Sequence, residues 1–223
     1  MIELEALRFN YPDGDFSLNI SELHIEQGEK VAVVGPSGSG KTTLLNLVAG
    51  IDVPQQGQIN VCRMALHELS DALRRDFRIT QIGFVFQSFE LLDYLNVLDN
   101  ILHPYRISRA LELNNEVRQR AIKLARQMGL GDMLYRRSNA LSQGERQRAA
   151  ICRALLPEPQ LILADEATGN LDPDNKRLIL DLLFDAVDHQ GATLLAVTHD
   201  HDLLPSFDRV IDFRQYYAGG RQL

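Results

Sequence analysis

The sequence is poor in cysteine and has no basic surplus, and each shortage excludes a class of protein. Its 223 residues include only Cys62 and Cys152, with no CxxC pair, and its six histidines show no zinc-ligand spacing. We therefore expect two reduced core thiols in a cytosolic protein, without a disulfide or zinc framework. Lys and Arg number 23 against 30 Asp and Glu, a net charge of −7, so we expect no nucleic-acid partner.

Long apolar runs are missing as well. No run approaches the roughly 18 residues that a membrane-spanning helix needs. The first residues, MIELEALRF, place Glu3 and Glu5 where a signal peptide has a basic start. We expect a chain without its own membrane span, so that any action at a membrane requires another chain. The length fits one α/β domain over residues 1–223 with an inserted subdomain.

The apolar residues that are present predict an α/β order along most of the chain. Short strands are expected in the first 30 residues, where 16–20 alternate in polarity. Continuous apolar runs predict further strands at 30–35, 81–87, 161–166, 193–199 and 209–213. Helices are expected at 42–50, ending at Gly50, and after Asp172, which would be the N-cap of a helix that ends at Gly191.

Residues 89–158 lack this strand pattern. Within NEVRQRAIKLARQMGL, residues 115–130, apolar side chains recur at helical spacing between arginines and a lysine. We predict a mostly helical insertion over 89–158, in a core formed by 1–88 and 159–223. Arginines cluster around 136–153, and we expect them on a solvated helix face or in salt bridges, without a catalytic role.

A glycine-rich stretch after the second group of strands predicts a phosphate site. GPSGSGKTT, residues 35–43, fits G-x-x-x-x-G-K-[ST] between a buried strand and a helix. Glycines let backbone N–H groups turn inward around phosphate oxygens, and the helix N-terminus adds a positive dipole end. An ordinary glycine-rich turn is the alternative, but motif and context agree. The predicted nucleotide-binding residues are Gly35, Pro36, Ser37, Gly38, Ser39, Gly40, Lys41, Thr42 and Thr43.

Other candidate residues follow the ends of predicted strands. Asp165 and Glu166 end LILADE, at the sheet edge where α/β proteins bind ligands, so Asp165 is expected to hold Mg²⁺ and Glu166 to polarise an attacking water. An acidic helix cap is the alternative. His199 and Gln87 end two other predicted strands, and each is interpreted as a phosphate contact. The simpler alternatives are that His199 is a structural histidine and that Gln87 only begins a loop. Tyr11 precedes Gly35 by 24 residues and could stack on a base.

The stretch NALSQGERQRAAICRAL, residues 139–155, predicts a second anion site. Ser142 and Glu145 have the spacing of a capping box, in which each side chain accepts a hydrogen bond from the backbone N–H of the other residue. A helix N-terminus with serine at the N-cap attracts anions. The helical insertion separates this helix from residues 35–43. We therefore expect it to hold the phosphate of another chain.

In their order and spacing, these motifs resemble the ATP-binding subunits of ABC transporters over essentially the full chain. The matching elements are Tyr11 (adenine-stacking aromatic), 35–43 (Walker A), Gln87 (Q-loop), 141–145 (signature), 161–165 (Walker B), Glu166 (catalytic base), 169–172 with Asp172 (D-loop) and His199 (switch histidine). Two positions depart from the family pattern. Gln143 replaces a signature glycine, and Ala167 replaces the proline that usually follows the catalytic glutamate.

The resemblance implies a P-loop NTPase of the α/β class, with a RecA-like mixed sheet core, an N-terminal antiparallel β subdomain and an inserted α-helical subdomain. It implies a homodimer around two ATP molecules, each held by the Walker A loop of one chain and by Ser142, Gln143, Gly144 and Glu145 of the other. It also implies Lys41, Glu166 and His199 as catalytic residues, and Thr42, Gln87 and Asp165 around Mg²⁺.

Within the family, IGFVFQSFELLDYLNVLDNI and DEATGNLD are most similar to the lipoprotein-releasing, macrolide-export and cell-division ATPases. These work with FtsX-like or MacB-like membrane permeases, which implies a peripheral protein at the cytoplasmic face of the inner or plasma membrane. Residues 88–101 are our candidate dock for the permease, with internal packing as the alternative. An FtsE-like transmission module without transport remains open. This sequence lacks the long coiled coil that a DNA-repair ATPase of the SMC type has between these motifs. A small-molecule kinase would have no use for the signature.

Overall fold

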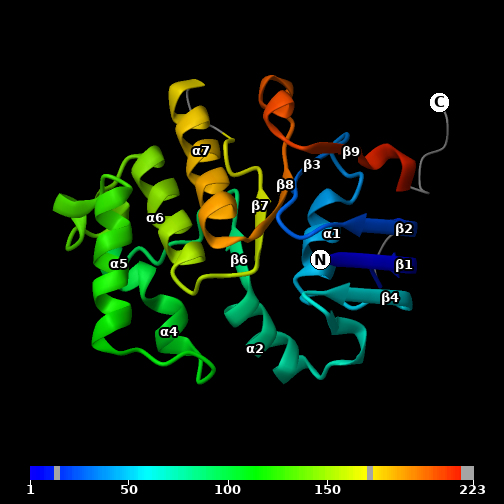
Figure 1. Ribbon diagram of the computed structural model, residues 1–223, viewed down its shortest axis with the longest axis horizontal. Helices are drawn as coiled ribbons and strands as arrows, with labels where there is room; N and C mark the ends of the chain where they lie inside the picture. Colours follow the sequence, from blue (N-terminus) through cyan, green and yellow to red (C-terminus); the bar gives the residue numbers. More distant parts are fainter. Residues whose placement is uncertain (13–15, 170–172, 217–223) are drawn as a thin grey trace.

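The computed structural model describes residues 1–12, 16–169 and 173–216, with backbone alone at 173 and 174. Within these ranges the strands form two sheets with helices beside them (Figure 1). The strands occupy the right and centre of Figure 1, and the helices α4, α5 and α6 gather on the left. The chain therefore has a sheet-containing part and a helical part, as the sequence predicts.

An antiparallel sheet occupies the N-terminal part of the described chain, in the order β2-β1-β4-β5. Its strands are β1 (Ile2–Asn10), β2 (Ser17–Ile25), β4 (Gln56–Val61) and β5 (Met64–Ala65). Buried and exposed side chains largely alternate along β1 and β2, so one face packs on the core and the other meets solvent. The expected antiparallel β element is confirmed.

The second sheet carries the strands that the continuous apolar runs predict, in the order β6-β7-β8-β3-β9. They are β3 (Lys30–Val34), β6 (Ile82–Val85), β7 (Leu161–Asp165), β8 (Thr193–Val197) and β9 (Arg209–Asp212). Every described pairing in this sheet is parallel. The expected mixed core is thus divided between two sheets of pure type, because the N-terminal strands pair among themselves and leave the buried strands to parallel crossovers.

The helices divide between the two parts of the molecule. Beside the sheets lie α1 (Lys41–Val48), α2 (Asp71–Gln81) and α7 (Pro173–Gln190). The helical part has α3 (Val97–Ile101), α4 (His103–Ile107), α5 (Asn115–Gln127) and α6 (Gln143–Leu155). Residues 89–158, all of which are described, contain no strand beyond an isolated bridge of Asn96 with Arg137. The sequence analysis missed α2, whose apolar positions are few.

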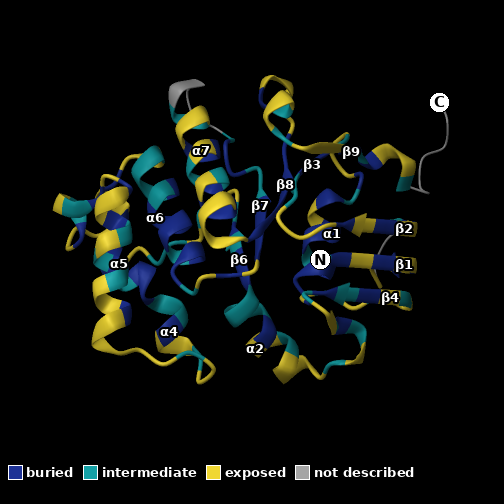
Figure 2. Cartoon of the chain, in the orientation of Figure 1, coloured by how far each residue is buried: buried dark blue, intermediate teal, exposed yellow. Residues whose placement is uncertain are grey.

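Two buried clusters hold these parts together, and they run along the dark blue interior of Figure 2. One joins the antiparallel sheet, α1 and one face of the parallel sheet. The other joins the opposite face to α7 and to α3, α5 and α6. Val97, Leu98 and Ile101 are buried in this second cluster. Their burial favours the alternative of internal packing for these three residues, whereas Tyr94 is exposed, so a dock on the rest of 88–101 stays a prediction.

Helix ends and cysteines mostly follow the sequence. Gly50 and Gly191 have φ of 63° and 67° and terminate α1 and α7 as expected. The predicted N-cap Asp172 lies outside the described residues. Both cysteines are free thiols; Cys152 is buried, whereas Cys62 is only partly so.

A substitution at Gly83 tests how tightly the parallel sheet packs against the helical part. A Cβ at Gly83 would lie 2.6 Å from the carbonyl oxygen of Ala154 at the end of α6 and 2.9 Å from Cγ of Pro159. Gly83→Ala should therefore lower the free energy of unfolding by about 1–3 kcal/mol, measured by urea denaturation. Gly129→Ala is the control, because φ is 69° there but no atom lies within 4 Å. A loss at Gly83 no larger than at Gly129 would contradict this close packing.

Candidate active site

A cavity of about 560 Å³ opens over the N-terminus of α1. The 35–43 loop forms its floor, and Phe16, Gln87, Glu166 and His199 complete its wall. Gln87, Glu166 and His199 follow β6, β7 and β8, whose carboxyl ends meet at one edge of the parallel sheet. The fold thereby brings together predicted site residues that are more than a hundred positions apart in sequence.

The glycines of the 35–43 loop meet a conformational requirement. Gly38 and Gly40 have φ of 77° and 95°, which L side chains rarely adopt. The loop then leads into α1 at Lys41, whose ammonium group donates to the carbonyl oxygens of Gly35 and Pro36 at 2.8 Å each. Pro36 and Ser39 do not contribute to the cavity wall. Backbone N–H groups and a cation thus surround a space for phosphate, as the motif predicts.

Thr42 and Asp165 meet at the floor of the cavity. The Thr42 hydroxyl donates to Oδ2 of Asp165 at 3.0 Å. Burial raises the pKa of Asp165 above its ordinary value, and the neighbouring Glu166 carboxylate adds to the rise; the Thr42 hydrogen bond and Lys41 oppose it. The site therefore holds a carboxylate whose charge is poorly compensated, which favours a cationic ligand beside it.

Glu166 is the point at which three predicted residues meet. The Gln87 side-chain amide donates to its Oε2 at 2.8 Å, and Nδ1 of His199 lies 3.4 Å from its Oε1. The Glu166 backbone has φ of 47°, a strained conformation held by a hydrogen bond from its N–H to the Val197 carbonyl. The turn carries this carboxylate out of the strand and into the cavity wall.

Tyr11 lies beside the cavity, outside its wall. Its hydroxyl lies 3.2 Å from Oγ1 of Thr43 and donates to Asp52 at 3.3 Å. Its ring packs edge-on against Phe9, with 4.8 Å between centroids. Phe16, which the sequence analysis did not select, provides the aromatic surface that faces the cavity.

The predicted capping box at the start of α6 is confirmed. The Ser142 N–H donates to Oε2 of Glu145 at 2.7 Å, and the Glu145 N–H donates to Oγ of Ser142 at 3.4 Å. The backbone bond from Ser142 is the main reason why the pKa of Glu145 is lowered. Ser142 and Gln143 are exposed and do not line the cavity of their own chain. The expectation that this helix end serves another chain stays a prediction.

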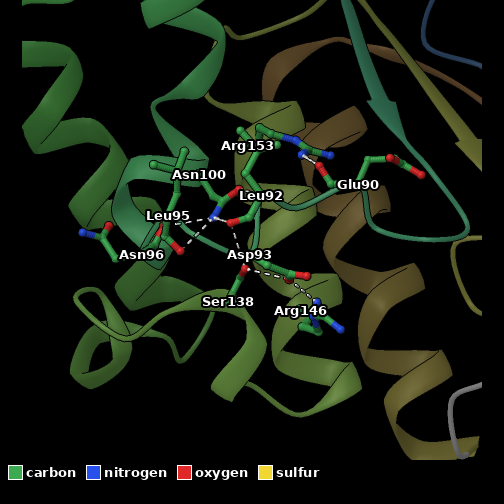
Figure 3. A network of polar contacts seen from close by, with 9 residues as sticks. All are labelled: Glu90, Leu92, Asp93, Leu95, Asn96, Asn100, Ser138, Arg146 and Arg153. Atoms are coloured by element: carbon green, nitrogen blue, oxygen red, sulfur yellow. Dashed lines mark hydrogen bonds and ion pairs between the residues drawn. The ribbon is translucent and has the colours of Figure 1, made fainter.

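Polar contacts tie α6 to the segment that follows Gln87 (Figure 3). Arg146 forms an ion pair of 2.7 Å with Asp93, and Arg153 donates to the carbonyl oxygens of Phe89 and Glu90. Asn100 braces the same segment through Leu92, since the two residues exchange side-chain to backbone hydrogen bonds. The sequence analysis expected only salt bridges or solvated arginines here. The structure shows a connection between Gln87 and the signature helix.

A second hollow, of about 750 Å³, lies between the two parts of the molecule. Its wall combines apolar side chains from α2, β6 and α4, such as Phe84 and Ile107, and Phe86 just after β6. The charged residues of the wall are Arg75, Arg78, Arg109, Arg153 and the carboxylates Asp76 and Glu90. Burial and the guanidinium groups of Arg153 and Arg106 lower the pKa of His103 in this wall. We call this surface the α2–α4 groove; its lining combines apolar side chains with more arginines than carboxylates.

Among the described residues, no helix is both long and apolar enough to cross a bilayer. No group of three or more His, Cys, Asp or Glu side chains within the described ranges has a metal-binding arrangement.

Comparison with known proteins gives concordant matches. The ABC transporter family profile matches residues 18–169. A lipoprotein-releasing system ATP-binding protein LolD from Hydrogenovibrio crunogenus is 38% identical, over 94% of this chain and 91% of its own length. A macrolide export ATP-binding/permease protein MacB from Rhodopirellula baltica is 42% identical over 95% of this chain, which spans only 31% of that protein.

The fold of a solved relative also matches. A dimeric ATP-binding cassette in a post-hydrolysis state, bound to ADP and Pi, has a TM-score of 0.86 and 34% identity. The match covers 95% of this chain and 94% of that chain.

Asp165→Asn tests the poorly compensated charge. A folded-state pKa raised above the unfolded value means that ionised Asp165 destabilises the fold, a penalty that is absent below the unfolded pKa of about 3.9 and grows as pH rises through the folded pKa. Asp165→Asn should therefore raise the melting temperature at pH 7 and have less effect at pH 4. Thermal unfolding of the nucleotide-free protein at both pH values measures this. A lower melting temperature at pH 7 would show that the Thr42 bond outweighs desolvation.

Proposed function

This chain belongs to the ABC transporter family, and we propose that it is the ATP-hydrolysing subunit of a membrane export or extraction system. The single observation that carries the proposal is the convergence of Gln87 and His199 on the Glu166 carboxylate, at the edge of a cavity whose floor is a phosphate-binding loop. This arrangement places a general base and its orienting groups beside the position of a terminal phosphate.

The residues of the loop perform the binding step. Phosphate oxygens replace the Gly35 and Pro36 carbonyls as partners of Lys41, and the backbone N–H groups before α1 donate to them. Glu166 then orients a water molecule toward the terminal phosphate and accepts its proton, with His199 as a further hydrogen-bonding group. The Gln87 amide donates to Oε2 of Glu166, so a water that is to be activated at that oxygen has to replace this contact.

Thr42 and Asp165 fit a magnesium ion. They place a hydroxyl and a carboxylate oxygen side by side next to the phosphate loop, and Mg²⁺ is usually bound by one or two such protein ligands together with substrate phosphates. Burial raises the pKa of Asp165, and the nearby Lys41 offsets only part of that rise. Gln87 would join this set after it leaves Glu166. The ion supplies neutralisation of the charge that develops on the phosphate oxygens.

A second copy of the chain would complete each site. Ser142, Gln143, Gly144 and Glu145 begin a capped helix that contributes nothing to its own cavity, so its anion-binding end is available to a partner's ATP. The solved relative bound to ADP and Pi is a dimer, which supports this assembly. Asp172 of the D-loop, assigned to the same interface, lies outside the described residues.

An integral membrane permease of the FtsX or MacB type would use this ATPase, with the chain peripheral at the cytoplasmic face of the membrane. The α2–α4 groove is the surface that best fits such a partner. Its lining includes several apolar side chains and a surplus of arginine, and Arg153 connects it to the segment after Gln87. A short permease helix with an apolar ridge and acidic flanks matches this wall.

Replacing the base should separate binding from hydrolysis. Glu166→Gln keeps the size and the polar contacts of the side chain but cannot accept a proton. We expect ATPase turnover to fall by about 10²–10⁴-fold while ATP still binds, and ATP-bound dimers to accumulate in size-exclusion chromatography. Lys41→Ala is the contrasting variant, since it should lose nucleotide affinity. Wild-type turnover by Glu166→Gln would exclude Glu166 as the base.

The proposed dock can be tested at Ile107, which lies in the groove and is 65% exposed. Ile107→Glu should weaken association with a co-expressed FtsX-like or MacB-like permease, because it places an anion on the apolar surface that the permease helix would cover. Basal ATPase activity of the isolated chain should stay the same. Tyr135→Glu is the matched control, at an exposed aromatic outside the groove. Equal co-purification of both variants with the permease would rule out this groove as the dock.

A further inference from the structure

We propose that Lys176 is a positioning residue for His199: through an ion pair with Asp200, it fixes the turn that presents the histidine to the cavity. This inference rests on the proposed function, because it takes His199 as a hydrogen-bonding group at the terminal phosphate. Lys176 lies outside every motif that the sequence analysis selected, and it does not line the cavity. Its effect on the reaction would therefore pass through another residue.

The side chain of His199 does little to fix its own position. It is 66% exposed. Within the described part of the chain, the polar partner of its ring is Glu166 alone, with 3.4 Å between Nδ1 and Oε1. Glu166 is also the group that has to orient the attacking water. The place of the ring therefore depends on the backbone on either side of it.

The two sides of this turn are anchored differently. Before His199, the Thr198 N–H donates to the carbonyl oxygen of Val33 in β3 at 3.2 Å, which ties the turn to the sheet. After His199, the Asp200 N–H donates back to Oγ1 of Thr198 at 3.1 Å, and Oδ1 of Asp200 accepts from the Asp202 N–H at 3.2 Å. These last two bonds span two residues each, so they shape the turn without attaching its far side to another element.

The ammonium group of Lys176 supplies that attachment. Its Nζ donates to Oδ2 of Asp200 at 2.7 Å. The two side chains are only 28% and 14% exposed, so salt screens this pair less than it screens a fully exposed one. The hydrogen bond from Lys176 is the main reason why the pKa of Asp200 is lowered. The carboxylate is therefore ionised at neutral pH and bound to a cation.

Helix α7 gives Lys176 a firm base. Ile179 and Leu183, further along the helix, are each 1% exposed in the core cluster, and α7 packs against β8, the strand that precedes the turn. Asn175, next to Lys176, lies against the start of α6: a Cβ at Gly144 would be 3.5 Å from its Oδ1. The first turn of α7 thus contacts both the signature helix and the turn that carries the histidine.

The simpler alternative is that this ion pair only adds stability. Partly exposed ion pairs contribute little to the free energy of unfolding. Catalysis is more sensitive to position, because a displacement of about 1 Å can cost on the order of 10²-fold in rate. A positioning role therefore predicts a loss of kcat that is large compared with the loss of stability.

Steady-state hydrolysis of Mg·ATP by the full-length chain tests this expectation. Lys176→Met keeps the long side chain and removes the charge; it should lower kcat by roughly 10- to 100-fold, with KM for ATP and the melting temperature close to wild type. Lys176→Arg should restore kcat, because it keeps a cation for Asp200. Lys30→Met is the matched control, since it removes an ion pair of 2.6 Å with Asp188 at the other end of α7, and kcat should not change.

A double variant shows whether Lys176 acts through His199. His199→Ala should slow hydrolysis, and the addition of Lys176→Met should slow it no further, because no ring remains to be positioned. Single-turnover measurements resolve these slow rates. If Lys176 only stabilised the fold, the two losses would combine in full.

Four results would overturn the inference: a wild-type kcat in Lys176→Met, an equal loss in Lys30→Met, a full further loss in the double variant, and wild-type hydrolysis by His199→Ala. If circular dichroism shows that Lys176→Met is unfolded, Asp200→Asn decides, since it keeps the capping oxygen and removes the charge that Lys176 binds. It should show the same loss of kcat. A wild-type chain that does not hydrolyse ATP would instead refute the proposed function itself.

Discussion

The parallel pairing of β3, β7 and β8 is the constraint on which the site depends. In a parallel sheet all carboxyl ends lie at one edge, so the residues after these strands are neighbours whatever their distance in sequence. The 35–43 loop follows β3, Glu166 follows β7, and His199 lies two residues beyond β8. Leu163 and Leu195 pair at the centre of this register, in strands buried on both faces. A shift in that register would separate the phosphate loop from the carboxylate that acts beside it.

This constraint also explains which residues the sequence could predict. Glu166, His199 and Gln87 each end a continuous apolar run, and a pattern of such runs already implies their common edge. The capping box of Ser142 and Glu145 is equally local, because both partners lie within one helical turn. The prediction of a mixed sheet was less accurate, because the choice of pairing partners depends on contacts between strands that the sequence of a single strand does not specify.

Other features of the structure have no local pattern in the sequence that predicts them. Phe16 lies outside every motif, and its position against Gly40 arises only when the β1–β2 hairpin packs over the phosphate loop. The ion pair of Arg146 with Asp93 joins positions 53 residues apart, and nothing in either neighbourhood marks the other. Val97, Leu98 and Ile101 seemed suited to an exposed dock, but their burial depends on how α3 packs against α5 and α6. Tertiary packing decides between an apolar surface and an apolar core.

The contacts of Gln87 suggest how nucleotide binding and the helical part communicate. The Gln87 amide donates to Glu166, and the chain that follows it is anchored to α6 through Phe89, Glu90 and Asp93. Transfer of Gln87 from Glu166 to a ligand in the cavity would therefore act on a segment that is bonded to the signature helix. The α2–α4 groove includes Glu90 of that segment and Arg153 of α6. The cavity, α6 and the groove are thus joined by one continuous set of contacts, and any coupling of ligands through these contacts would be two-way.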